Sequence, residues 1–239
     1  MNRILFLLIP LALTFGGSAA QAVLLGPLGG SGLSGEYAQS SDSPFAALDF
    51  SGGYFHLEDF EDGLQNTPGV SGNNGGVTSV VFGPAIHDSV DLDDGSLDGS
   101  GLAGDSWFFS NGAAGVTWTF NAGALGSLPT HAGIVWTDGG NPQTFEAFDA
   151  GGASLGTVAG SHATAGNSGQ TDSDRFYGVI DLGGISAIKL SNLGGGIELD
   201  HLQYGNAGVA NDVLEPGTLT LFGIGLMGLG VMRRRHKAA

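Results

Sequence analysis

Between residues 54 and 204 the chain repeats short runs of β-branched and aromatic residues, each bounded by Gly, Asn, Asp or Pro. In Val116–Phe120 the valine, tryptophan and phenylalanine share one face and two threonines share the other, which is the alternation of a half-buried strand. The same pattern predicts strands at Tyr54–Leu57, Val77–Phe82, Trp107–Ser110, Val116–Asn121, Ala132–Thr137, Thr144–Asp149, Ser154–Val158, Phe176–Leu182, Ile185–Ser191 and Ile197–Tyr204.

No stretch between Ala22 and Glu215 shows a convincing helical period, and the frequent glycines would make long helices costly. The alternation of the last predicted strand slips after Asp200, because Leu202 stays in phase with it, so we expect a bulge near His201. Many short strands separated by turn signals predict an all-β fold, an antiparallel two-sheet sandwich or jelly roll.

The segments around the predicted sandwich differ in composition. Residues 23–53 are rich in Gly and Ser, and we expect a mobile lead-in at Leu25–Gly35 and an edge strand at Phe45–Phe50. The sandwich then occupies residues 54–205, and residues 206–213 read as a flexible linker. This order predicts one domain between two specialised ends.

The first 22 residues have the three parts of an export signal. Arg3 provides the positive region, Ile4–Phe15 the apolar helix, and Ala20–Ala22 the small-x-small cleavage pattern. We therefore expect an N-terminal signal helix and export of the rest of the chain.

The C-terminal tail combines an uncharged apolar run, Thr218–Met232, with a basic cluster that follows at once. The cluster consists of Arg233, Arg234, Arg235 and Lys237. An apolar run ending in dense positive charge is typical of a segment that stops in a membrane with its end on the cytoplasmic side. The run has about 15 residues where about 20 make a comfortable span, which predicts a short transmembrane helix. A buried core helix is the alternative, and it has no use for the basic residues.

The tail as a whole resembles the PEP-CTERM sorting signal of Gram-negative bacteria that make exopolysaccharide. Its turn of Glu215, Pro216 and Gly217, its apolar run and its basic cluster stand in the order of that family, although Leu214 occupies the place of the first proline. The resemblance implies an exosortase-type processing enzyme as a partner, a transient stay in the inner membrane, and delivery to the cell surface or extracellular space.

Charge limits the partners of the exported part. All 23 acidic residues lie between Glu36 and Glu215, whereas Arg175 and Lys189 are the only basic residues between the two ends, so this part has a formal charge of −21. Such a field repels nucleic acid and attracts cations, which excludes nucleic-acid binding. The chain has no cysteine, so core packing, bound metal or both must stabilise the domain.

The densest acidic segment is the predicted loop from His87 to Gly101, with five aspartates. Hard oxygen ligands separated by glycine turns suit calcium, and Asp91, Asp93 and Asp98 are the candidate ligands. The spacing departs from that of an EF-hand, and a solvated Asp/Gly turn is the alternative interpretation.

A second acidic cluster carries another resemblance. Phe60–Gly63 and the late strand segment Leu199–Leu202 are similar to the opening turn and closing strand of carbohydrate-binding modules with the galactose-binding-like sandwich. In that family a turn glutamate and a last-strand aspartate help to hold a structural calcium, which implies Glu61 and Asp200 as ligands here. Two ordinary exposed carboxylates are the alternative.

Two further residues have competing interpretations. Arg175 follows Asp172 and Asp174, and we expect a structural ion pair, with a ligand-orienting role as the alternative. Trp107 follows the Asp-rich loop and is the best candidate for an exposed surface that stacks on a sugar ring, although a place in the core is the stronger expectation for the tryptophans in general.

Catalytic patterns are weak. The histidines lack the spacing of a zinc site, and no catalytic residue is assigned. The sequence therefore predicts a non-enzymatic exported protein of the cell surface or extracellular matrix, structural or adhesive, with affinity for exopolysaccharide and with structural calcium. A secreted carbohydrate-active hydrolase that uses paired carboxylates is the alternative.

Overall fold

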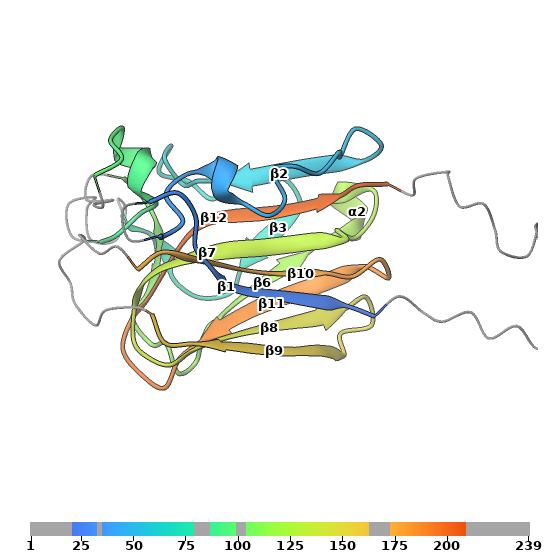
Figure 1. The fold of residues 1–239 in the computed structure, drawn as a ribbon. Coiled ribbons are helices and arrows are strands. Elements are labelled where there is room, and N and C mark those ends of the chain that lie inside the picture. The colour runs from blue at the N-terminus through green and yellow to red at the C-terminus, as the bar shows by residue number, and fades with distance from the viewer. Residues whose placement is uncertain (1–20, 33–34, 79–86, 99–103, 163–172, 209–239) are drawn as a thin grey trace, which may run out of the picture.

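The computed structural model describes residues 21–32, 35–78, 87–98, 104–162 and 173–208, which form two packed antiparallel sheets (Figure 1). The predicted all-β sandwich is therefore confirmed. The predicted signal helix and the short helix of the tail lie outside the described residues.

The larger sheet has seven strands. Their order is β1 (Val23–Leu28), β10 (Arg175–Ile180), β7 (His131–Gly139), β12 (Ile197–Asn206), β5 (Trp107–Phe109) and β4 (Gly76–Val77), with β2 (Tyr54–Glu58) paired to β12 as well. The smaller sheet has the order β3 (Val70–Gly72), β6 (Val116–Phe120), β11 (Ile185–Ser191), β8 (Gln143–Asp149) and β9 (Ser154–Gly160). Each of the ten predicted strand segments contains a strand, although most of Val77–Phe82 lies outside the described residues.

The sequence pattern missed strands β1 and β3. The expectation of a mobile lead-in is wrong for Val23–Leu28, because this segment pairs with β10 in the register Val23 to Ile180. Phe45–Phe50 is not an edge strand either; it forms turns, and the side chain of Phe45 is buried. Neither segment shows a clear local alternation, so its structure depends on a distant partner.

The main core lies between the two sheets. The predicted inward face of β6 is confirmed, since Val116, Trp118 and Phe120 are all buried there. Facing side chains come from the larger sheet, among them Ile134, Trp136, Leu199, Leu202 and Tyr204. Burial of such large apolar surfaces is the main stabilising contribution to a domain without disulfides.

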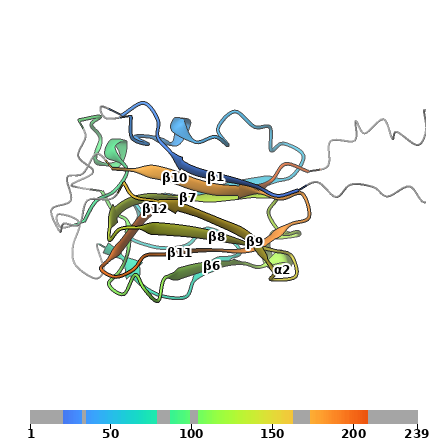
Figure 2. The ribbon, with the colours of Figure 1, turned by 60° about the horizontal axis from the view of Figure 1, so that its bottom comes forward.

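A second, smaller core covers the outer face of the seven-stranded sheet. The segment of residues 35–53, which we call the cover segment, contributes Tyr37 and Phe45, and these pack with Val90, Val135 and Phe176. Figure 2 shows this segment, with the 3₁₀ helix η1 (Ser40–Asp42), on the side of the sheet away from the five-stranded layer. Strand β7 is consequently buried on both faces along its full length.

Two glycines make room for this outer core. Gly133 of β7 and Gly178 of β10 are directly paired, and the ring of Phe176 lies over both. A Cβ atom at Gly133 would come within 2.2 Å of Cζ of Phe176. The absence of side chains at this pair is thus a packing requirement.

Strand β12 contains the predicted bulge. Its register with β7 shifts between Asp200 and Gln203, and His201 has a φ of 44°. A bulge places two consecutive side chains on one face of a sheet. As a result, Leu199 and Leu202 face the main core, while Asp200 and His201 both face the cover segment.

Candidate functional site

The bulge of β12 and the 3₁₀ helix η2 (Asp91–Asp94) together form an acidic site. One ligand atom each from Asp93, Asp200 and His201 lies within 4.8 Å of the others. Figure 1 shows η2 at the end of the sandwich opposite the start of β1 and the end of β12. The site therefore joins a loop to the central strand of the larger sheet.

Backbone hydrogen bonds hold η2 in this position. The N–H of Val90 donates to Oδ2 of Asp200 at 2.8 Å, and the N–H of Leu92 donates to the carbonyl of Ala38 at 3.0 Å. Helix η2 ends at Gly95, whose φ of 94° lies in the left-handed region that favours glycine. These contacts place the Asp93 carboxylate over the bulge.

His201 makes two contacts that assign its proton. Its Nε2 lies 2.9 Å from Oδ2 of Asp93, and its Nδ1 lies 3.2 Å from the hydroxyl of Tyr37. The hydroxyl of Tyr37 in turn accepts a hydrogen bond from Nε2 of Gln203 at 2.8 Å, so it donates to Nδ1. A ring protonated at Nε2 then presents its N–H on the side of Asp93, but the approach lacks hydrogen-bond geometry, and Oδ2 of Asp93 has no hydrogen-bond partner among the described residues.

Glu61 lies outside that close group but near enough to feel the charge of Asp93, and we call the four residues Glu61, Asp93, Asp200 and His201 the bulge site. Glu61 follows the strained turn at Phe60, whose φ is 61°, and its Oε1 accepts the N–H of Asp105 at 2.6 Å. Partial burial, followed by the negative charges of Asp93 and Asp105, raises the pKa of Glu61 to about 7. The residue keeps contact with solvent, which screens part of this effect.

Asp200 is the buried centre of the site. Complete burial, and then the charge of Asp93, raise the pKa of Asp200 well above its ordinary value, although the N–H groups of Val90 and His201 lower it. Glu61 and Asp200, both with a raised pKa, lie near the charge of Asp93, and carboxylates crowded in this way are expected to bind a cation in exchange for protons. Each carboxylate oxygen can accept more than one contact, so the hydrogen bonds leave lone pairs for a metal.

The donor set fits a hard cation such as calcium. Glu61, Asp93 and Asp200 would supply oxygens, and the two ring nitrogens of His201 are occupied by Asp93 and Tyr37. In that arrangement His201 orients a metal-binding carboxylate without binding the metal. Metal binding through Nε2 itself would instead suit zinc, because nitrogen is a common zinc ligand.

The remaining predicted site residues lie elsewhere. Asp91 turns away from the bulge site and accepts the N–H of Asp98 at 3.1 Å, while the side chain of Asp98 is exposed. Arg175 donates from Nη1 to the carbonyl of Asp174 at 2.7 Å. The structure therefore brings together Glu61, Asp93 and Asp200, but not Asp91 or Asp98. His201 was missed as a site residue because a lone histidine carries no spacing signal.

The expectation of an exposed stacking surface at Trp107 is wrong. Its side chain is 8% exposed and packs against the rings of Phe60 and Trp118, and its Nε1 donates to the carbonyl of Asn74. Strand β5 lies between β12 and β4, which turns this tryptophan into the main core.

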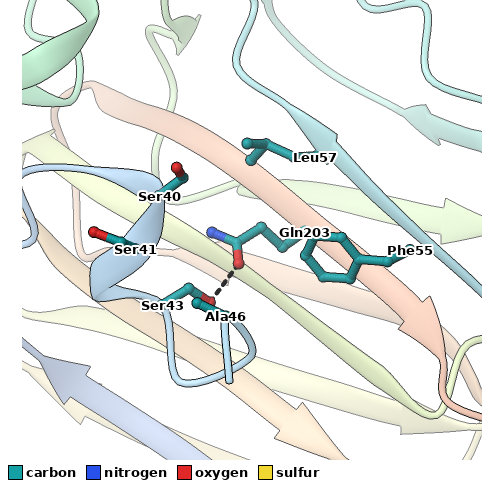
Figure 3. Close-up of a pocket in the computed structure, with 7 residues that line it drawn as sticks. All are labelled: Ser40, Ser41, Ser43, Ala46, Phe55, Leu57 and Gln203. Carbon is teal, nitrogen blue, oxygen red and sulfur yellow. Dashed lines mark hydrogen bonds between the residues drawn. The ribbon is translucent and has the colours of Figure 1, made fainter. Parts of the chain in front are cut away.

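A pocket of about 260 Å³ lies beside the bulge site, between the cover segment and β2 (Figure 3). It is lined by Ser40, Ser41, Ser43, Ala46, Phe55, Leu57 and Gln203. In Figure 3 Ser40 and Ser43 lie on the other side of Gln203 from Phe55 and Leu57, whereas the side chain of Ser41 points away from Gln203. Gln203 accepts a hydrogen bond from the hydroxyl of Ser43. Phe55 is 38% exposed and is the aromatic ring at the opening. The sequence pattern did not indicate this pocket.

The pocket and the bulge site share one hydrogen-bond chain. Ser43 contacts Gln203, Gln203 contacts Tyr37, and Tyr37 contacts the ring of His201. Burial raises the pKa of Tyr37, so its hydroxyl stays protonated and can bridge the two. The positions of the pocket wall and of Asp93 are thus linked through fixed contacts.

The described part of the chain is thus an all-β sandwich domain with a carboxylate-rich site. Residues 215–235 match the PEP-CTERM protein-sorting motif, which confirms the prediction from the tail. This motif implies recognition by an exosortase, with export and processing at the membrane.

Other comparisons are weaker. A comparison with curated proteins found no match. Among solved structures, the chain is similar to the enzymatically active domain of tailspike protein 4 from bacteriophage CBA120, with 14% identity and a TM-score of 0.25. The match covers 70% of this chain and 21% of that chain, so the chain spans about a fifth of the tailspike domain. Within the described residues, no helix has the length and apolar character needed to cross a bilayer.

Proposed function

We propose that the sandwich is a surface-displayed glycan-binding domain that binds exopolysaccharide in the pocket beside the bulge site. The observation that supports this proposal is the composition of the pocket. Most of the pocket surface is apolar and comes from Ala46, Leu57 and Phe55, whose ring can pack on the apolar face of a pyranose. Ser43 and Gln203 are buried and bonded to each other, so the exposed Ser40 is the side chain that can bond a sugar hydroxyl. The sorting motif delivers a chain to the place where exopolysaccharide is found.

The bulge site would bind calcium as a structural ion. Its three carboxylates come from the turn after β2, from η2 and from β12, so one ion would fix loops that are separate in sequence. Because the hydrogen-bond chain links the site to Gln203, we expect calcium to order the pocket wall. The role we propose is structural and adhesive, without catalysis.

Glycan binding can be tested with the purified full chain in mild detergent. The probes are an immobilised glycan panel and exopolysaccharide from a bacterium that uses the PEP-CTERM system. Wild-type protein should bind at least one of them. Phe55→Ala should weaken that binding about two- to tenfold, since an aromatic contact contributes about 0.5–1.5 kcal/mol.

Leu182→Ala is the matched control, because Leu182 is a large apolar residue with 67% exposure that does not line the pocket. It should bind like wild type. Absence of binding to every probe, or equal binding by Phe55→Ala, would refute the pocket as a glycan site. Release of new reducing ends during the incubation would instead support the hydrolase alternative.

A further inference from the structure

The polar groups at the base of the pocket already have partners within the protein. Ser43 donates to Oε1 of Gln203 and accepts the N–H of Phe45 at 3.0 Å. Nε2 of Gln203 in turn donates to the hydroxyl of Tyr37 at 2.8 Å, and both Ser43 and Gln203 are buried. A sugar hydroxyl placed against this base would therefore have to compete with bonds that already exist.

The wall that β2 contributes is apolar. Tyr54 packs against the main core, so its alternating neighbours Phe55 and Leu57 lie on the outer face of the sheet, where they line the pocket. The ring of Phe55 packs against the ring of Phe50, with centroids 4.8 Å apart, and Phe50 packs edge-on against His131. This stack limits the orientations open to Phe55, so the ring is in place before a ligand binds.

The opposite wall offers one hydroxyl and no charge. Ala46 and Ser40 are exposed there, and none of the seven lining residues is charged. The neighbouring Asp42 turns its carboxylate elsewhere, because its Oδ2 accepts the N–H of Ala38 at 2.9 Å and the hydroxyl of Ser31 at 3.0 Å. The pocket thus suits an uncharged sugar and disfavours the carboxylate of a uronic acid.

The size and lining of the pocket limit the ligand further. Its volume of about 260 Å³ lies below the ~300–1,000 Å³ of sites that enclose drug-sized molecules, so it suits a single sugar residue. A methyl group gains free energy against this lining, because its apolar surface leaves water. A hydroxyl beyond the one that Ser40 can pair loses free energy there, because a buried polar group without a hydrogen bond is unfavourable.

From these contacts we infer that the pocket selects a sugar residue with a methyl group, as in a 6-deoxyhexose or an acetylated sugar, over its hydroxylated counterpart. This inference rests on the proposed glycan binding and names the class of sugar that is bound. The methyl group would lie against Phe55, Leu57 and Ala46, and Ser40 would bond one hydroxyl of the ring. The rest of the polysaccharide would stay in solvent.

The test compares sugars that differ only at the methyl group. The probes are the methyl glycosides of fucose and galactose, and of rhamnose and mannose, each pair with one absolute configuration. The methyl glycosides of N-acetylglucosamine and glucose form the pair for an acetyl group. The Kd of each probe is measured by NMR titration of the full chain in mild detergent.

In at least one pair the methyl-bearing sugar should bind about fivefold or more tightly than its counterpart. The reason is that one buried, unpaired hydroxyl costs about 1 kcal/mol or more. The pair with the largest ratio then shows whether the methyl group belongs to a deoxy sugar or to an acetyl group.

A pair of neighbouring alanines provides matched variants. Ala46→Ser adds a hydroxyl to the pocket wall at an exposed position, so it should lower the ratio to about two or less, because the sugar hydroxyl then has a partner. Ala47→Ser is the control, since Ala47 is also exposed but does not line the pocket. It should keep the preference of wild type.

The outcomes separate this inference from the proposed glycan site. If panel glycans bind and Phe55→Ala weakens them, equal or tighter binding of the hydroxylated probes, or no binding of the methyl-bearing ones, would overturn the inference alone. Absence of binding to every probe and every panel glycan would overturn both. A preference for methyl-bearing sugars that Ala46→Ser does not reduce would place the selection outside the pocket, which also overturns the inference.

Discussion

The stability of the domain should depend on calcium, and the dependence should change with pH in a defined direction. A ligand that binds the native state with about a 100-fold excess over its Kd stabilises that state by about 2.7 kcal/mol. For a domain of this size, 1 kcal/mol shifts the melting temperature by about 2–4 °C. One calcium ion at the bulge site should thus raise the melting temperature by about 5–10 °C.

The pH dependence follows from Glu61. Its pKa in the folded protein is about 7, above the ordinary value of 4.5. In metal-free protein the folded state holds the proton more tightly, so stability should fall as pH rises from about 4.5 to 7. The full shift corresponds to about 3 kcal/mol, and solvent contact at Glu61 reduces the expected loss to about 1 kcal/mol.

Calcium reverses this trend because it binds the deprotonated carboxylates. The gain in melting temperature on adding calcium should therefore be larger at pH 8 than at pH 5.5. The measurement is thermal unfolding followed by circular dichroism, on protein freed of metal by a chelating resin and then titrated with calcium. Asp93→Asn should lose a large part of the gain, and Asp94→Asn should keep it.

Two results would refute the reasoning. An unchanged melting temperature at saturating calcium would mean that no native-state site exists. An equal gain at both pH values would mean that Glu61 does not titrate with ion binding. Zinc that stabilises at lower concentration than calcium, with the gain lost in His201→Gln, would show that His201 binds the metal directly.

Three further predictions concern the fold and the tail. Glu58→Ala should lower the free energy of unfolding by about 3 kcal/mol in urea titrations, because the buried carboxylate of Glu58 accepts hydrogen bonds from four donors in the following turn. Glu58→Gln should lower the free energy of unfolding by less. Gly133→Ala should lower the free energy of unfolding by about 2–3 kcal/mol, because the added Cβ overpacks against Phe176. A Cβ at Gly183 would lie 3.4 Å from its nearest neighbour, so Gly183→Ala should be as stable as wild type in the same assay. Replacing the basic cluster 233–235 by glutamines should leave unprocessed chain in cell fractions, and normal processing would contradict the role of that cluster.

Local sequence patterns were sufficient to predict most of the strands of the sandwich. Alternation in Val116–Phe120 identified a strand and its buried face, because a strand's side-chain period is set by the backbone itself. The slip after Asp200 identified the bulge for the same reason. The short strand β3 and strand β1, which has no alternation, gave no such signal, since their pairing partners supply the stabilisation.

The sites depended on contacts between residues far apart in sequence. Val90 and Asp200 are 110 residues apart, and Tyr37 and His201 are 164 apart. No spacing rule relates such positions, so acidic composition could indicate cation binding without showing which carboxylates meet. Trp107 shows the same limit, because its burial depends on where β5 pairs.

The sequence by itself determined most of the strands, the bulge, the strong negative charge and the sorting tail, because each is a property of neighbouring residues or of composition. Only the tertiary structure decided that η2 places Asp93 beside Asp200 and His201 at the bulge of β12. It also decided that the cover segment creates a pocket. These features exist only where the sheet order brings distant segments together, and the sheet order is a property of the whole packed chain.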